Sequence, residues 1–129
     1  MGIEGMILPM SVRAIRGATQ VEENSASAIA AGTKELLAEI LRSNNLEVGQ
    51  VISVLLTATP DLNAAFPAAA AREVGFESTP LLCAVEIDVP GALQRVVRAM
   101  VTVETSASMA EISHIYLGGA KALRRDIAQ

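Results

Sequence analysis

Three charged side chains of this sequence could take part in chemistry because of where they lie. Arg16, Glu86 and Arg98 each occur in an otherwise apolar segment that alternates like a β-strand. Removing such a charge from water without a partner costs several kcal/mol or more. Two interpretations stay open on spacing alone: an Arg to Glu ion pair within the sheet, or charges that line a pocket for an anionic ligand bearing a hydroxyl.

Most routes to covalent, redox or metal chemistry lack the residues they need. His114 is the only histidine, so neither a paired-histidine metal site nor a histidine-dependent nucleophile is expected. No GxSxG, P-loop or GxGxxG motif occurs. Cys83 has no basic partner in sequence, and we interpret it as a small buried residue rather than a nucleophile. We therefore expect no metal and no cofactor.

Composition limits the partners. The 129 residues fit one domain, and a hydrophobic content of 51% predicts apolar surface beyond what a monomer hides, which favours a homo-oligomer. The net charge of −4 argues against nucleic acid as a partner. A single cysteine forms no internal disulfide, and neither a signal peptide nor a membrane span is recognised. We expect a cytoplasmic protein without a membrane partner.

The elements that must position these residues form an α+β fold, a mixed β-sheet with one long and one short helix. Residues 1–10 are expected to be a disordered N-terminal extension, and 11–129 a single domain. The long helix is expected within 24–45, where apolar residues recur at helical spacing, and the short one between Pro67 and Gly75. Strands are expected within 12–21, 50–59, 81–89, 95–105 and 115–117, and the run 50–59 is apolar enough to be covered on both sides. A glycine-broken tail follows.

Four segments together resemble the monofunctional AroH-class chorismate mutases. They are "VRAIRGATQVEEN", "LLTATPDLNAAFPAAAAREVGF", "VPGALQRVVRAMVTVET" and "HIYL", in the family's order and with similar gaps over about residues 12–126. The resemblance implies a homotrimer with a pseudo-barrel core of packed sheets and active sites between adjacent subunits. It also implies the conversion of chorismate to prephenate, a Claisen rearrangement in phenylalanine and tyrosine biosynthesis that uses no cofactor or metal.

The same resemblance assigns roles to side chains. Arg98 would point at the ether oxygen and the side-chain carboxylate, Arg16 and Tyr116 would bind that carboxylate, and Glu86 would accept the ring hydroxyl. Cys83 matches a neighbouring position that touches this hydroxyl. Since residues three apart in a strand point to opposite faces, Cys83 and Glu86 converge only if the strand bulges or Cys83 uses its backbone.

Further residues would complete the cleft. The resemblance implies that Phe66 of the adjacent subunit walls the ring, that Arg72 lies near the ring carboxylate, and that Leu123 and Arg124 belong to a segment that closes over the site. Arg95, like Arg13 and Arg42, is interpreted as a surface charge.

Two other functions remain as alternatives. Small trimeric deaminases of the Rid type also use an interface arginine and a carboxylate, but their proline- and glycine-rich segments are not visible here. A non-catalytic trimer that binds an aromatic-pathway metabolite is the other. Loss of chorismate absorbance with prephenate as the sole product would separate the mutase from both.

Overall fold

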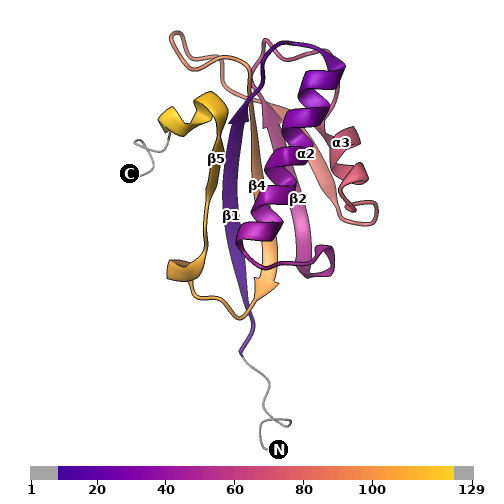
Figure 1. Cartoon of the computed structure of the whole chain (residues 1–129), viewed down its shortest axis with the longest axis vertical. Coiled ribbons are helices and arrows are strands. Elements are labelled where there is room, and N and C mark those ends of the chain that lie inside the picture. Colours follow the sequence, from indigo (N-terminus) through magenta and orange to yellow (C-terminus); the bar gives the residue numbers. More distant parts are fainter. Residues whose placement is uncertain (1–8, 124–129) are drawn as a thin grey trace, which may run out of the picture.

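The computed structural model describes residues 9–123, which form one five-stranded sheet with two α-helices on one face (Figure 1). The predicted mixed α+β class is confirmed. The strands are β1 (Ser11–Gln20), β2 (Val51–Ala58), β3 (Leu81–Val85), β4 (Val96–Thr105) and β5 (Ile115–Leu117). The helices are α2 (Ala26–Ser43) and α3 (Pro67–Glu73), and the 3₁₀ helices are η1 (Val48–Gln50), η2 (Met109–Glu111) and η3 (Gly118–Leu123).

The sheet has the strand order β3-β2-β4-β1-β5. The central strand β4 is antiparallel to both β1 and β2, whereas the edge strands β3 and β5 are parallel to their neighbours β2 and β1. Residues far apart in sequence therefore meet on adjacent strands, and this pairing brings the candidate site residues together.

The long helix forms where its apolar spacing predicts. Ser25 caps its start by accepting the Ala28 N–H at 3.1 Å. Asn24, the residue before this cap, accepts the N–H groups of Asn63 and Ala64 through its side chain. The buried positions recur at helical spacing and face the sheet; they are Ile29, Thr33, Leu36, Leu37 and Ile40.

The two faces of the sheet differ within the chain. One face packs under α2 and α3 with fully buried residues such as Ile15, Leu56 and Val101. The other face, which we call the open face, leaves Leu55 and Leu82 exposed. The expectation that the strand within 50–59 is covered on both sides is therefore not met inside one chain. The side chains of this face need another partner to be buried.

Two segments differ from expectation. The strand expected within 81–89 ends at Val85, because its neighbour β2 ends at Ala58, the partner of Val85, and only one further bond follows, from Glu86 N–H to the Ala58 carbonyl. The described part of the glycine-broken tail forms the helix η3, which begins at Gly118 with a φ of +57°. Of the predicted extension 1–10, only Pro9 and Met10 lie within the described residues.

Candidate active site

Strand register brings three of the predicted site residues onto one patch of the open face. Arg98 on β4 lies opposite Ala18 on β1, and Ala18 lies opposite Tyr116 on β5. Arg16 stands two residues before Ala18 and points to the same face. Ala18 itself is fully buried, in a cluster that includes Tyr116.

These side chains line a cavity of about 190 Å³, which we call the arginine hollow. Two arginines and a tyrosine thus border one cavity, beside apolar walls from Leu55 and Met100. Guanidinium groups bind carboxylates through paired hydrogen bonds. The hollow therefore suits a small anion with an apolar body. The full lining is Arg16, Gly17, Leu55, Thr57, Arg98, Ala99, Met100 and Tyr116.

Glu86 is joined to the edge of this hollow by hydrogen bonds. Arg98 Nε donates to both carboxylate oxygens, at 3.1 and 3.0 Å, and the Thr57 hydroxyl donates to Oε2 at 2.7 Å. The Glu86 side chain is 16% exposed and that of Arg98 is 44% exposed. The carboxylate is thus fixed and largely removed from water, while the arginine still reaches open space. The ion pair and the pocket, which spacing alone left as alternatives, occur together.

Cys83 does not share the face of Glu86. Its side chain packs against the core cluster that contains Leu56 and Phe76, on the helix-covered side of the sheet. Glu86 contacts Thr57 and Arg98 on the open face. No bulge occurs in the β2 and β3 pairing that could turn one side chain toward the other.

Phe66 and Cys83 line a different cavity, of about 450 Å³, together with Pro67 and Val85. Phe66 caps the start of α3 and is 77% exposed. Arg72 lies exposed in the last turn of the same helix. Neither residue lines the arginine hollow of its own chain.

Leu123 lies at the end of η3 and packs against a small cluster that includes Ala18 and Tyr116, both close to the arginine hollow. Arg124, the other residue predicted in this segment, lies outside the described residues.

Within residues 9–123, no three or more His, Cys, Asp or Glu side chains are grouped to hold a metal ion. No described helix has the length and apolar character needed to span a membrane.

Comparison with known proteins decides the family. The model of the family described as chorismate mutase type I matches residues 12–127. The chain belongs to this family. Chorismate mutase AroH of Bacillus subtilis (strain 168) is 42% identical over 120 residues, covering 92% of this chain and 94% of the relative. Chorismate mutase AroH of Thermus thermophilus is 43% identical over 117 residues, covering 90% and 96%.

A solved structure agrees with these sequence matches. The chorismate mutase from Clostridium thermocellum has a TM-score of 0.85 and 50% identity, covering 86% of this chain and 99% of that one. The predicted family, and with it the prediction of an isomerase of the chorismate mutase type in aromatic amino acid biosynthesis, are confirmed.

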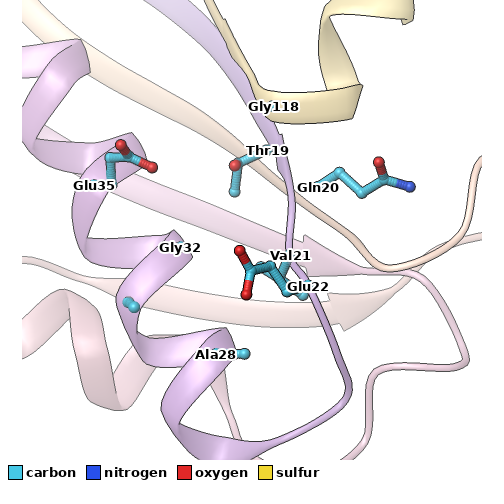
Figure 2. Close-up of a pocket in the computed structure, with 9 residues that line it drawn as sticks. Thr19, Gln20, Val21, Glu22, Ala28, Gly32, Glu35 and Gly118 are labelled. Carbon is cyan, nitrogen blue, oxygen red and sulfur yellow. The ribbon is translucent and has the colours of Figure 1, made fainter.

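A larger cavity of this chorismate mutase family member lies elsewhere, between the end of β1, the first half of α2 and Gly118 (Figure 2). Its volume is about 620 Å³, and Figure 2 shows the carboxylates of Glu22 and Glu35 directed into it. Two negative charges disfavour a carboxylate ligand. This cavity is therefore less suited to a carboxylate ligand than the smaller arginine hollow of this chorismate mutase.

Three contacts at or near the site were not foreseen. Thr57 orients Glu86, and the Arg16 N–H donates to His114 Nδ1 at 2.9 Å. Arg95 is more than the predicted surface charge, because its guanidinium donates to the carbonyls of Val21 and Glu22. Each contact joins distant parts of the chain, so no local sequence pattern gave a signal for it.

Proposed function

We propose that the arginine hollow binds chorismate and that the chain converts it to prephenate there. The observation that carries this proposal is the meeting of Arg16, Arg98 and Tyr116 around one cavity, with Glu86 fixed beside them. Membership in the chorismate mutase type I family supports it. No observation favours the Rid-type deaminase or the non-catalytic trimer.

The reaction suits a site without a nucleophile. A [3,3] rearrangement breaks the ether C–O bond and forms a C–C bond within one molecule, so no proton or electron moves to the protein. The protein must hold the compact diaxial conformer and stabilise the charge that separates in the transition state. Fixed guanidinium groups meet that need without reorganising during the reaction.

Arg98 carries the largest role in this proposal. Its Nε is bound to Glu86, so the two terminal nitrogens are the part of the fork that is directed to the ligand. We assign them to the ether oxygen, on which negative charge grows, and to the side-chain carboxylate. Arg16 and the Tyr116 hydroxyl bind the same carboxylate from the neighbouring strands β1 and β5.

Glu86 accepts the ring hydroxyl in this proposal. A carboxylate offers about four lone-pair positions, and the three hydrogen bonds from Arg98 and Thr57 leave room for one more donor. Its negative charge also lies near the carbon skeleton, over which positive charge spreads. Because the Cys83 side chain packs into the core, we assign its contact with the hydroxyl to its backbone.

A homotrimer would complete the site. The open face exposes apolar side chains that a second subunit would bury, among them Val12 at 59% and Leu82 at 66% exposed. Phe66 and Arg72 do not line the hollow of their own chain, which supports their reaching the hollow of an adjacent subunit. Leu123 and Arg124 would then belong to the segment that closes over the bound substrate.

We also infer a cytoplasmic location, since a chain with one cysteine forms no internal disulfide. The test of the function is direct: purified protein is mixed with chorismate, and the absorbance is followed while the product is identified. Prephenate as sole product supports the proposal; unchanged chorismate, or a different product, refutes it.

A further inference from the structure

The backbone N–H of Arg16 donates to a side chain rather than to a strand carbonyl. The Arg16 N–H donates to Nδ1 of His114 at 2.9 Å. The pairing of β1 with β5 begins one residue later, where Gly17 lies opposite Ile115. The imidazole therefore takes the place of a backbone acceptor one residue before the pairing of β1 with β5 begins.

His114 is itself anchored from the opposite side. Asn44, the C-cap of α2, donates to the Ser113 carbonyl at 2.9 Å and accepts the Ser113 N–H at 2.8 Å. Two hydrogen bonds thus fix the residue before His114 to the end of the long helix. A continuous set of contacts runs from α2 through Ser113 and His114 to the backbone of Arg16.

We propose that His114 is a positioning residue for Arg16, and that its neutral imidazole sets the strand segment from which this guanidinium enters the arginine hollow. The proposal rests on the proposed function in one respect, namely that Arg16 binds the substrate carboxylate. A β-strand residue whose amide loses its acceptor can shift or twist, and small displacements of a positioned group cost binding.

The hydrogen bond requires one protonation state. Nδ1 can accept only while it carries no proton, which leaves the proton of the neutral ring on Nε2. Burial, and after it the positive charge of Arg16, lowers the pKa of His114 below its ordinary value of 6.5, which favours the accepting form. Protonation at acid pH would remove the acceptor and place a second positive charge beside Arg16.

The other charges on the surrounding elements are hydrogen-bonded, of like sign to an imidazolium, or directed into the larger cavity. Arg13 on β1 donates through Nε to Ala107, and the Glu111 carboxylate in η2 accepts the Ser108 N–H. The other charged side chains of α2 form the pairs Lys34 with Glu73 and Glu39 with Arg42, except for Glu35, which lines the larger cavity; η3 carries Lys121. Among the described contacts, no carboxylate is paired with His114 to hold its proton.

Two variants of matched size separate positioning from packing. His114→Asn keeps an acceptor at the same distance along the side chain, one that does not titrate, whereas His114→Leu keeps bulk and removes the acceptor. We expect His114→Leu to raise KM by about 3- to 10-fold, the equivalent of one hydrogen bond, with a smaller change in kcat. His114→Asn should recover most of this loss, and its KM should stay flat at acid pH where the wild-type value rises.

An equal KM for the His114→Leu and His114→Asn proteins would overturn the positioning role. So would a rise of KM at acid pH in the His114→Asn protein that equals the rise in the wild type.

Nitrogen-15 NMR of the imidazole supplies a readout that is independent of activity. We expect Nδ1 without a proton at neutral pH and an Arg16 amide signal that shifts as His114 titrates. A proton on Nδ1, or an unresponsive Arg16 amide, contradicts the inference even if chorismate is converted. If the NMR result holds but chorismate is not converted, the proposed function fails and the hydrogen bond stands.

Discussion

Arg98 on β4 donates its Nε–H to both carboxylate oxygens of Glu86, at 3.1 and 3.0 Å, across the intervening strand β2. Each residue of this pair stabilises or orients the other. The carboxylate is satisfied although it is largely buried, and the guanidinium plane is held so that its terminal nitrogens have a fixed direction. A partly buried ion pair is weak evidence for a role in stability. Because Arg98 of this pair lines a cavity, the pair is better explained by its effect on the direction of the guanidinium group.

Arg98→Ala should lower kcat by at least about 10²- to 10³-fold, the typical loss for one transition-state donor, while the protein stays folded. Arg98→Lys should recover little, because a single ammonium cannot pair with Glu86 and the ligand through one planar group. Arg42→Ala is the matched control, since Arg42 also pairs with a glutamate, Glu39, but on the exposed side of α2. Near-normal turnover of the Arg98→Ala protein would refute the role.

Glu86→Ala should also be slow while remaining folded, because it removes both the acceptor for the ring hydroxyl and the group that orients Arg98. Thr57→Val tests the orientation alone: it deletes the hydroxyl that donates to Glu86 but leaves the carboxylate in place. We expect a smaller loss in kcat/KM for Thr57→Val, about 3- to 10-fold. A Glu86→Ala protein that unfolds, and is rescued by an apolar residue there, would instead indicate a purely structural ion pair.

The sequence predicted the candidate site better than it predicted how that site is held together. Alternation along each strand is local, so it placed Arg16 and Arg98 on apolar faces correctly. The register that puts Ala18 between Arg98 and Tyr116 depends on pairing between distant strands, which no local pattern specifies. For the same reason, a lone histidine gave no sign that its ring would meet the Arg16 backbone.

The end of β3 illustrates the same limit in the fold. The apolar run to Val89 predicts a longer strand, but a strand needs a partner, and β2 stops at Ala58. The length of one strand is therefore decided by the length of another. By contrast, the helix α2 was predicted closely because its cap and its buried stripe are both encoded within it.

Shared active sites predict complementation between inactive chains. If Arg98 acts in the hollow of one subunit and Arg72 reaches it from the next, mixing Arg98→Ala chains with Arg72→Ala chains should regenerate intact sites. Random assortment around a three-fold axis would restore about one quarter of the clefts. The readout is chorismate turnover after co-refolding, with each variant refolded alone as control. Mixed trimers without activity would count against shared clefts, and a monomeric mass in solution would exclude the trimer itself.

The titration of His114 predicts how stability depends on pH. Its pKa is lowered in the folded chain, so the unfolded chain binds more protons between the folded value and the ordinary value of 6.5. The contribution of the neutral His114 to the free energy of unfolding is therefore fully present above pH 6.5. It is lost as the pH falls toward the pKa that His114 has in the folded chain. Thermal unfolding of wild type and His114→Asn between about pH 7.5 and about pH 5.5 should show a shallower decline for the variant. Parallel curves would contradict the lowered pKa.

Gly17 joins the core to the site, and its replacement should reveal that link. A Cβ at this position would lie 2.8 Å from Ile40 Cδ1, 2.9 Å from Leu36 Cδ1 and 3.3 Å from the Ile115 carbonyl. Gly17→Ala must therefore displace the terminal methyl groups of Ile40 and Leu36 within the packed core of α2 and β1, or strain the pairing with β5, at a cost of about 1–3 kcal/mol in the free energy of unfolding. Gly49→Ala is the control, because no atom lies within 4 Å of its added carbon.

Since Gly17 follows Arg16 directly, we expect that the Gly17→Ala protein, where it remains folded, also binds chorismate more weakly. Urea unfolding and KM measured on the same preparations would test both effects, and an unchanged stability would show that α2 can yield at this contact.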